Sequence, residues 1–374
     1  MEKIVCHITS VHHRYDNRIF RKECTSLALA NYKVYLIVND DLNDEVKNNV
    51  SILNINKKKQ SKINRIFGAK KNFINKAVQI NADLYHIHDP ELLPLGDALI
   101  KRNKKVIFDS HEDVPNDLLD KNWIPKVFRR SVSILYEKYE KKVVKDFSAV
   151  VCVTPNVVKR FRKTAKRVEM ITNYPIVKNR KLEKIDLKSP IKYFCYAGVI
   201  EKSWNHHLII KAISEFEDVK YLLAGRANEE YLSELKNMAE WKNVEYKGFV
   251  SHDEVEKIYQ QSIAGFALNQ CNQLSESGGT LGNNKLFEYM YAGIPVVCTN
   301  YKLWEDLIEE YNCGIAINPD NYSEIVSSVE KIITTPSLAK EMGNNGKIIV
   351  EKKYNWQTQE EVLINLYKEV LGEL

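Results

Sequence analysis

Several features that would assign the chain to a common class of protein are missing from its sequence. No run of apolar residues approaches the ~20 that a helix needs to span a bilayer. The seven cysteines are scattered and form no C-x-x-C pair, which favours reduced thiols and argues against a zinc site. The first residues, MEKIVCHI, read as a strand and lack the pattern of a signal peptide. We therefore expect a cytoplasmic protein.

Four kinds of motif are also absent, and each absence excludes a kind of site. The sequence has no G-x-G-x-x-G, the fingerprint of Rossmann dinucleotide-binding proteins. It has no D-x-D triplet, so a metal-chelated diphosphate is not expected, and no nucleophile elbow for a Ser-His-acid hydrolase. Helix-turn-helix, zinc-finger and RNA-recognition signatures are missing, which excludes nucleic acid as the expected partner. We expect no metal and no cofactor.

What is present is an ordinary globular composition with alternating strands and helices. The 374 residues are 44% hydrophobic and 28% charged, which suggests two or three domains, and the net charge of +6 permits an anionic partner. A strand at Lys3–Thr9, a helix at Ile19–Ala30 and a strand at Lys33–Val38 open the chain as a βαβ unit, which favours a parallel sheet. The expected fold class is α/β. Later strands are expected around residues 84–87, 106–108, 149–154, 191–197, 221–224, 244–246, 263–268, 294–299 and 314–317, and helices around 156–161, 254–261, 284–292, 304–310 and 356–374.

The stretch Asn283–Asn300, NNKLFEYMYAGIPVVCTN, predicts a short helix, a stop and a buried strand. Asn283 can cap the helix, and Gly293 with Pro295 can end it. Lys285 and Glu288 are three residues apart near the helix N-terminus, so they share a face. The carboxylate could accept two hydrogen bonds from a vicinal diol such as a ribose, and the lysine could hold a phosphate. The alternative is a salt-bridged surface pair.

A glycine-rich loop, residues 277–282, leads into this helix. Free backbone N–H groups and the helix dipole favour an anion at such a place, and Gly282 and Asn284 lie at it. The motif K-L-F-E-Y-M-x-A-G-x-P-V-V resembles the donor site of GT-B glycosyltransferases, in particular the retaining family 4. The resemblance implies a nucleotide-sugar donor whose ribose is bound by Glu288. Most members have a second glutamate where this chain has Thr280, and the chain resembles instead a subset with an Asn-Lys pair at this place.

The resemblance extends to the start of the chain. The run H-x-R-x-D-x-R-I-F-x-K-E, which begins at His12, resembles the N-terminal loop of the same subset, a loop that faces the cleft between the domains. It implies that Arg14, Asp16 and Arg18 lie on the acceptor side. The alternative is a solvated loop with structural ion pairs.

Two polar clusters follow predicted strands of the first half. His88 and Asp89 lie at the end of the strand around residues 84–87, at the edge where open α/β sheets bind ligands. The run H-I-H-D-P resembles a family segment whose second histidine faces the donor sugar, so His88 and Asp89 are the predicted catalytic residues; a structural histidine is the alternative. His86 should pack in the sheet. A metal is conceivable at this histidine pair, but no third ligand has a recognisable spacing. In the second cluster, His111 and Glu112 are expected on the acceptor side, and Asp109 could orient a histidine.

The second half departs from the family at its first loop. Gly198 ends a strand, and family members often have basic residues one and six positions after this glycine, where this chain has Val199 and Trp204. Lys202 is the nearby basic residue that could substitute. Arg226 follows another strand end, and the segment up to Val250 resembles the one whose backbone contacts the nucleobase.

The resemblance implies two Rossmann-like domains that face a central cleft. The expected acceptor domain is 1–172, the linker 173–190 and the nucleotide-sugar domain 191–353, with a helix at 354–374 that crosses back to the first domain. The implied activity is that of a retaining, metal-independent, hexosyltransferase-like enzyme that uses a glycan or lipid-linked glycan acceptor, in bacterial surface polysaccharide synthesis. Alternatives are a sugar-nucleotide epimerase or hydrolase, or an inactive nucleotide-sugar-binding subunit.

Two segments rich in Lys and Arg have interleaved apolar residues. Lys57–Ala82 contains no acidic residue, and Lys121–Lys145 includes Trp123, Val127 and Phe128. Basic amphipathic helices suit an anionic membrane surface, which would place the protein peripherally on the inner face of the cell membrane. The alternative is that both are ordinary outer helices of an α/β domain.

Overall fold

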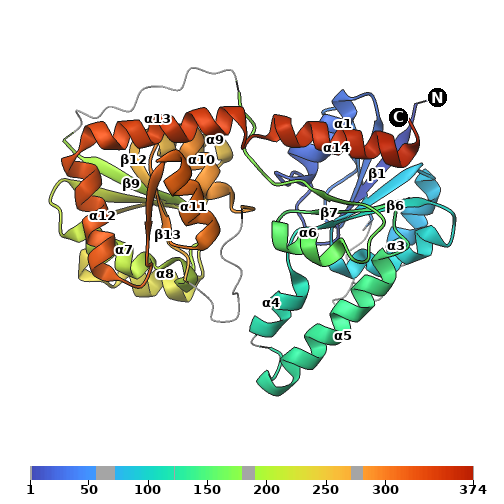
Figure 1. Ribbon diagram of the computed structural model, residues 1–374, viewed down its shortest axis with the longest axis horizontal. Coiled ribbons are helices and arrows are strands. Elements are labelled where there is room, and N and C mark those ends of the chain that lie inside the picture. Colours follow the sequence, from blue (N-terminus) through green and yellow to red (C-terminus); the bar gives the residue numbers. More distant parts are fainter. Residues whose placement is uncertain (1, 56–71, 122, 179–189, 271–280, 374) are drawn as a thin grey trace. The chain divides into compact units, whose positions relative to one another are not determined.

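The computed structural model describes residues 2–55, 72–121, 123–178, 190–270 and 281–373 (Figure 1). The chain forms two compact units, each with a parallel sheet between helices, which confirms the predicted two-domain α/β class. Unit 1 comprises Met1–Asn173 together with Trp356–Leu374, and unit 2 comprises Tyr174–Asn355. Among the described residues, no helix is both long and apolar enough to cross a membrane.

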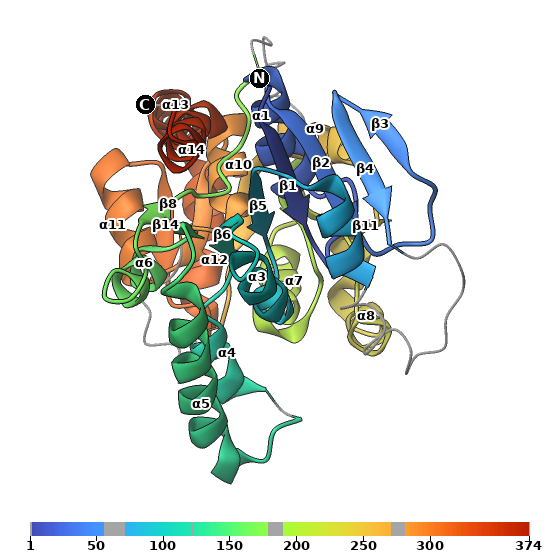
Figure 2. The ribbon, with the colours of Figure 1, turned by 90° about the vertical axis from the view of Figure 1, so that its right-hand side faces the viewer.

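The sheet of unit 1 has the strand order β3-β4-β2-β1-β5-β6-β7-β8 (Figure 2). Its pairs are parallel except for the antiparallel pair of β3 and β4. The order reverses between β1 and β5, and ligands of open α/β sheets bind beside the carboxyl ends of strands at such a point. The strands are β1 (Ile4–Ile8), β2 (Lys33–Val38), β3 (Glu45–Lys47), β4 (Val50–Asn54), β5 (Leu84–Ile87), β6 (Lys105–Ser110), β7 (Ala149–Cys152) and β8 (Val168–Met170).

Helices cover both faces of this sheet. One face packs through Cys6, Ile8, Tyr85 and Ile87 against apolar side chains of α3, α5 and α6. The other lies under the π-helix η1, α1 and the C-terminal helix α14, whose Trp356 Nε1 donates to Ser26 Oγ at 2.9 Å. The helices are η1 (Ile19–Cys24), α1 (Thr25–Leu29), η2 (Pro90–Leu92), α3 (Leu93–Ile100), α4 (Val114–Asp120), α5 (Lys126–Val144), α6 (Pro155–Phe161) and α14 (Trp356–Leu371), with a further helical stretch at residues 72–80.

The sheet of unit 2 is parallel throughout, in the order β11-β10-β9-β12-β13-β14, and it reverses between β9 and β12. A single apolar core surrounds it. Its strands are β9 (Lys192–Ala197), β10 (Val219–Ala224), β11 (Val244–Gly248), β12 (Ser262–Ala267), β13 (Val296–Thr299) and β14 (Gly314–Ile317). Its helices are η3 (Lys202–Trp204), α7 (His206–Ser214), α8 (Glu229–Lys236), η4 (Ala239–Asn243), α9 (His252–Gln260), α10 (Asn284–Ala292), α11 (Lys302–Tyr311), α12 (Tyr322–Thr334) and α13 (Pro336–Lys352).

Helix α10 has the predicted limits. The side chain of Asn283 caps it by accepting the backbone N–H of Lys285 at 3.1 Å, and Gly293 ends it with a left-handed φ of 78°. The predicted end of β6 is wrong, because the strand continues through Asp109 and Ser110. Those two side chains are therefore fixed by the sheet rather than carried by a loop.

Candidate functional site

Lys285 lies at the point where the strand order of unit 2 reverses. Its ammonium nitrogen is 4.5 Å from the ring centre of Trp204 and 5.1 Å from that of Tyr196. A Cβ placed on Gly198, just after β9, would come within 2.5 Å of Lys285 Cε, so a larger residue there would displace the lysine from this position. Burial lowers the pKa of Lys285, against the opposing charges of Glu288 and Glu201. The site therefore holds a poorly solvated cation at the carboxyl end of the sheet, where an anion would gain most from it.

Glu288 lies one turn further along α10. It is half-buried, and its Oε2 accepts the hydroxyl of Tyr259 at 2.9 Å. Among the described residues it forms no ion pair with Lys285, so the alternative of a salt-bridged surface pair does not hold there. The remaining lone pairs of the carboxylate leave capacity for further donors such as ribose hydroxyls.

The N-terminal approach to α10 is only partly described. Gly282 and Asn284 are half-buried beside the capping Asn283, whereas Thr280 and the rest of the glycine-rich loop lie outside the described residues. Helix α10 presents its N-terminus at the same edge of the sheet as Lys285. Both the helix dipole and the lysine favour negative charge at this place.

The remaining predicted donor residues follow β9, β10 and β11. Lys202 is well exposed and its Nζ donates to Glu234 at 2.9 Å, so the structure assigns it a surface ion pair and does not support its substitution for a missing phosphate ligand. The guanidinium of Arg226 stacks over Phe249, with its central carbon 4.7 Å from the ring centre. Val250 is half-buried, directly after β11. These strand ends pack closely, because a Cβ on Gly225 would lie 1.7 Å from the carbonyl oxygen of Gly198.

In unit 1 the strand order reverses at Asp89, between β1 and β5. Its Oδ2 accepts from Thr9 Oγ1 at 2.8 Å and from the backbone N–H of Ser10 at 2.6 Å, and its Oδ1 is 3.3 Å from His12 Nε2. Burial alone would raise the pKa of Asp89, but the hydrogen bonds from His12, Ser10 and Thr9 outweigh it and lower that pKa to about 2. Asp89 thus fastens the loop after β1, and its prediction as a catalytic residue is not supported.

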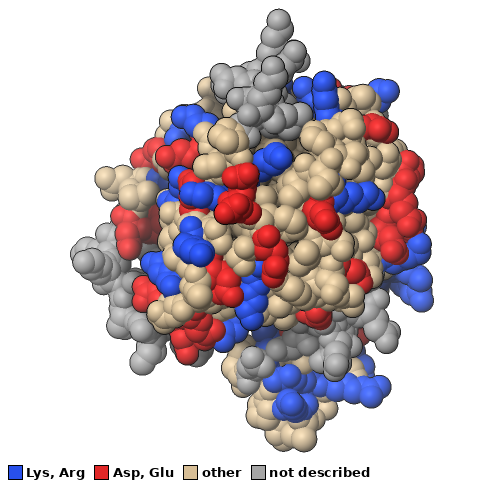
Figure 3. Space-filling model, turned by 90° about the vertical axis from the view of Figure 1, so that its left-hand side faces the viewer, with Lys and Arg blue, Asp and Glu red and all other residues tan. Residues whose placement is uncertain are grey.

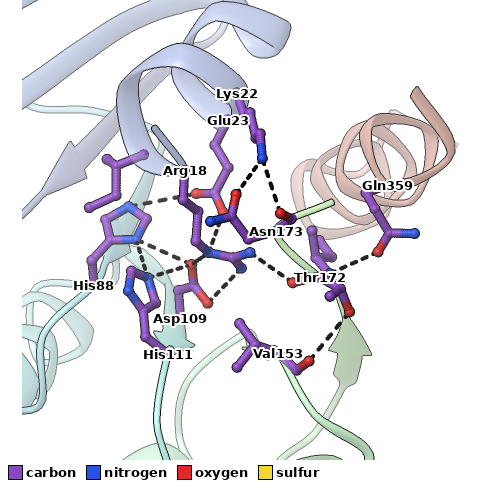
Figure 4. A network of polar contacts seen from close by, with 12 residues as sticks. Arg18, Lys22, Glu23, His88, Asp109, His111, Val153, Thr172, Asn173 and Gln359 are labelled. Atoms are coloured by element: carbon purple, nitrogen blue, oxygen red, sulfur yellow. Dashed lines mark hydrogen bonds and ion pairs between the residues drawn. The ribbon is translucent and has the colours of Figure 1, made fainter. Parts of the chain in front are cut away.

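Asp109, at the end of β6, gathers several polar side chains (Figure 4). Arg18 donates to both of its oxygens, from Nε at 2.8 Å and from Nη2 at 2.9 Å, and His111 Nε2 lies 2.9 Å from Oδ2. Burial alone would raise the pKa of Asp109, but Arg18 and His111 hold it well below its usual range. Asp109 therefore orients a histidine, as predicted, and the pair resembles the carboxylate–imidazole arrangement that positions a catalytic histidine.

His88 is buried, with 1% of its surface exposed. Its Nε2 is 2.8 Å from His7 Nδ1, and its Nδ1 is 3.3 Å from Asp109 Oδ2 and from His111 Nε2. Both ring nitrogens are thus engaged within the protein, so the prediction that His88 itself contacts the donor sugar is not supported. The side chain of His111 remains 18% exposed and is the more accessible imidazole of this cluster.

The predicted arginines of the N-terminal loop form structural ion pairs. Arg14 is buried, donates to both oxygens of Asp40 at 2.7 Å and is 2.6 Å from Glu45 Oε1, so these contacts do not support its assignment to the acceptor side. Arg18 is likewise committed to Asp109. This outcome matches the alternative of structural ion pairs in this loop.

Asp16 and Glu112 are the other predicted acceptor-side residues. Asp16 Oδ1 accepts the backbone N–H groups of Arg18 and Ile19 at 2.8 and 2.9 Å, so Asp16 caps the start of η1. Glu112 remains available at the surface, and together with burial it raises the pKa of Asp117 to about 7.

Two family models together span most of the chain. The model described as Glycosyltransferase Family 4 matches residues 8–174, and the one described as Glycosyl transferases group 1 matches residues 177–348. The chain therefore consists of two glycosyltransferase domains, of the family 4 and group 1 kinds, in a GT-B fold. The narrower subset with an Asn-Lys pair, and retention of configuration, stay predictions.

Curated relatives of this GT-B chain are distant. An uncharacterized glycosyltransferase of Methanocaldococcus jannaschii is 25% identical over 197 residues, which is 50% of this chain and 48% of that protein. The alpha-1,3/1,6-mannosyltransferase ALG2 of Dictyostelium discoideum is 26% identical over 295 residues, 73% of this chain and 67% of that protein. This chain therefore spans about half the length of the archaeal relative.

Solved structures share the GT-B fold over the whole chain. Sucrose-phosphate synthase from Thermosynechococcus elongatus has a TM-score of 0.75 at 15% identity, with 100% of both chains covered. WaaG, a glycosyltransferase involved in lipopolysaccharide biosynthesis, has a TM-score of 0.69 at 12% identity, covering 97% of this chain and 99% of that one. HepE from Anabaena, in complex with UDP-glucose, has a TM-score of 0.68 at 13% identity, covering 98% and 99%. At these identities the likeness shows the fold alone.

Sequence reasoning missed the aromatic support of the GT-B donor site and most of the buried partners of His88. Trp204 occupies a position where relatives often have a basic residue, yet here its ring contacts the ammonium of Lys285. His7 is paired with His86 in the register of β1 and β5, a contact that no sequence spacing reveals. The alternation of His7 with apolar neighbours in a predicted strand was the available signal.

Proposed function

We propose that this GT-B protein transfers a sugar from a nucleotide-sugar donor to a glycan or lipid-linked glycan acceptor, with retention of the anomeric configuration. The observation that carries this proposal is the pairing of Lys285 and Glu288 on one helix, at the reversal point of the sheet in unit 2. HepE, which shares the fold, has been solved with UDP and with UDP-glucose. A nucleotide sugar has both groups that the pair suits, a diol and a diphosphate.

The chemistry assigned to this site is electrostatic. Glu288 accepts hydrogen bonds from the ribose hydroxyls, and Lys285 with the N-terminus of α10 stabilises the charge that develops on the leaving diphosphate. Gly198 leaves the space in which the ammonium and a phosphate oxygen meet. The acceptor hydroxyl attacks the sugar on the face that the diphosphate leaves. The leaving diphosphate accepts the proton of that hydroxyl. We assign the neutralising charge to this chain's own residues, without a metal.

We assign the acceptor side to the Asp109–His111 pair and Glu112. With its Nε2–H on Asp109, His111 presents its Nδ1 as a hydrogen-bond acceptor on the accessible side of the ring. Such a nitrogen can orient a hydroxyl of an incoming sugar. The carboxyl groups of Glu112 and of Asp117, whose pKa burial and Glu112 raise to about 7, can accept further sugar hydroxyls.

A lipid-linked acceptor is favoured by the outer surface of α4 and α5. Trp123 is 75% and Val127 80% exposed, and Phe128 and Leu135, seven residues apart on α5, share a face. Exposed lysines and arginines flank them at positions 121, 126, 130, 138 and 142. In Figure 3 the lowest part of the molecule, where Figure 1 draws the tip of α5, shows Lys and Arg with uncharged side chains and no Asp or Glu in view. We propose that this surface contacts an anionic membrane; of the other predicted basic segment, residues 57–71 lie outside the described residues.

A thermal-shift screen of sugar nucleotides followed by product analysis tests the function. A donor that binds only the native state raises the apparent stability, by RT ln(1 + [L]/Kd). Lys285→Ala should remove the shift, whereas the matched surface variant Lys202→Ala should keep it. Donor consumption that requires an acceptor supports a transferase, and consumption without an acceptor indicates a hydrolase or epimerase. Binding without turnover on any acceptor indicates an inactive subunit.

A further inference from the structure

A row of buried aromatic hydrogen-bonding groups runs through unit 1 to Asp109. His7 lies on β1, His86 and His88 lie on or just after β5, and Tyr367 reaches them from α14. His86 and His88 are two residues apart in extended chain and therefore share a face of the sheet, and His7 is the register partner of His86. All four side chains are shielded from solvent. Because buried polar groups are nearly always hydrogen-bonded, we expect most of their polar atoms to be paired within the row.

The contacts form a series that forks at His88, whose Nδ1 is 3.3 Å from both Asp109 Oδ2 and His111 Nε2. His111 Nε2 carries its proton towards Asp109, so it cannot accept a second proton from His88. His86 Nδ1 is 2.8 Å from the Tyr367 hydroxyl, which is 3.0 Å from His7 Nε2. His7 Nδ1 is 2.8 Å from His88 Nε2, and His88 Nδ1 is 3.3 Å from Asp109 Oδ2. A neutral imidazole donates once and accepts once, and a phenol can do both. Each link can therefore be made only if all protons point the same way along the series.

Asp109 decides that direction. Arg18 and His111 keep it ionised, so it can only accept, and a bare ring nitrogen 3.3 Å from it would be repelled. His88 then carries its proton on Nδ1 and accepts on Nε2 from His7 Nδ1–H. His7 accepts on Nε2 from the Tyr367 O–H, and Tyr367 accepts from His86 Nδ1–H. The first nitrogen of the row, His86 Nε2, is then a lone pair, and it has no hydrogen-bond partner among the described residues.

We propose that His7 and Tyr367 are positioning residues, which fix the proton of His88 on Nδ1 and thereby hold the Asp109–His111 pair in its reactive orientation. Burial lowers the pKa of all three histidines of the row, which keeps them neutral as the series requires. The kinetic part of this inference rests on the proposed glycosyl transfer. The assignment of protons does not, so the two can fail separately.

A bound metal ion is the competing interpretation of the same residues. His7, Glu23, His86 and His88 offer ligand atoms within 4.8 Å of one another, and neither oxygen of Glu23 has a hydrogen-bond partner among the described residues. Arg18 Nε, however, is already 3.1 Å from Glu23 Oε1, which puts one cation beside this carboxyl group. Burial raises the pKa of Glu23 well above its usual range, so a protonated Glu23 leaves the cluster neutral without an ion. A metal would also displace the proton between His7 and His88.

Long-range ¹H–¹⁵N spectra of the full chain labelled with ¹⁵N-histidine test the assignment directly. We expect Nδ1–H tautomers for His7, His86 and His88 and the Nε2–H tautomer for His111, with single-residue His→Gln variants used to assign the signals. Nε2–H tautomers at His7 and His88 would overturn the proposal. So would one equivalent of tightly bound metal in the purified protein together with the shifts of metal-bound nitrogen. The tautomers are read from the spectrum of the wild type, and the variants serve only to assign its signals.

Tyr367→Phe tests the consequence. It removes one hydroxyl, and we expect the His7 and His88 signals to lose their single tautomer and kcat to fall about tenfold, with the donor KM little changed, because displaced catalytic groups are costly. Tyr32→Phe is the matched control, since Tyr32 OH donates to Glu373 in the same C-terminal region but outside the series. Unchanged histidine tautomers in Tyr367→Phe, or equal loss of kcat in both variants, would refute the role. If no acceptor supports turnover in the wild type, the proposed function fails while the spectra still decide the proton positions.

Discussion

At the scale of single residues, Glu288 depends on its neighbour Tyr259 for its orientation. The tyrosine hydroxyl takes up one carboxylate oxygen, which fixes the side chain while leaving room for further donors. Lys285 depends in the same way on Trp204 and Tyr196, which hold an ammonium without neutralising it. The aromatic partners thus leave both charges available for a ligand.

Glu288→Gln should weaken donor binding by about 1.5–3 kcal/mol, the usual contribution of a hydrogen bond to a charged group. The amide keeps the shape of the side chain and can still accept from Tyr259, so stability should change little. Isothermal titration with the donor found in the thermal-shift screen measures the effect, and urea unfolding checks the fold. Donor affinity equal to that of the wild type in a folded variant would contradict the assignment.

Asp89→Asn should lower the free energy of unfolding by about 2 kcal/mol near neutral pH. The folded pKa of Asp89, about 2, is below its ordinary value of 3.8, so its contribution is complete above about pH 4 and is lost as pH falls towards 2. The difference between variant and wild type in urea unfolding should therefore shrink on acidification. A difference that stays constant from pH 7 to pH 3 would show that the charge of Asp89 is not its source.

At the scale of elements, the sequence predicted features that depend on neighbouring residues, such as the ends of a helix. It did not predict contacts between residues that are far apart in the chain. Helix α10 was predicted because Asn283 and Gly293 mark its two ends within the sequence itself. The role of His88 was not, since its partners His7 and Asp109 come from strands whose register no local pattern reveals. The three-residue strand β3 was missed because it carries one apolar residue, and β4 was missed although three of its five residues are apolar. Helix α10 was thus predictable, and the buried contacts of His88 were not.

Helix α5 carries the element-scale prediction about membranes. The protein should bind anionic vesicles and release them as salt rises, because each well-placed Lys or Arg contributes about 1 kcal/mol and exposed charges are screened over about 8 Å at physiological salt. The double variant Trp123→Ser, Phe128→Ser should lose most of this binding. Co-sedimentation with anionic and neutral vesicles over a salt series measures it.

A matched control for the membrane experiment is Phe249→Ser, which removes another exposed aromatic ring, in unit 2. It should bind vesicles as the wild type does. Equal binding of the wild type to neutral and anionic vesicles, or none to either, would exclude the membrane surface. A soluble glycan would then be the better acceptor candidate.

At the scale of the whole molecule, the two units differ in how continuous they are. Unit 2 is one uninterrupted segment with its own core, whereas unit 1 needs α14, whose buried Leu363, Leu366 and Tyr367 complete one face of its sheet. A fragment of residues 174–355 should therefore unfold cooperatively by itself and retain donor binding. A fragment of residues 1–173 should be poorly folded until a peptide of residues 354–374 is added. Urea unfolding followed by circular dichroism measures the stability of both fragments. A fragment 1–173 that is stable alone and unchanged by the peptide would contradict the prediction that unit 1 needs α14.

Because α14 belongs to unit 1, that unit cannot be completed until the end of synthesis on the ribosome. Unit 1 is begun first, yet Trp356–Leu371 emerges only after all of unit 2. At about 5–20 residues per second, the completed segment 1–173 waits roughly 10–40 s for the helix that covers the histidines of β1 and β5. During that interval the later-made unit can already be folded while the earlier one still exposes apolar surface. Nascent chains should therefore recruit chaperones to the N-terminal segment until translation is nearly complete.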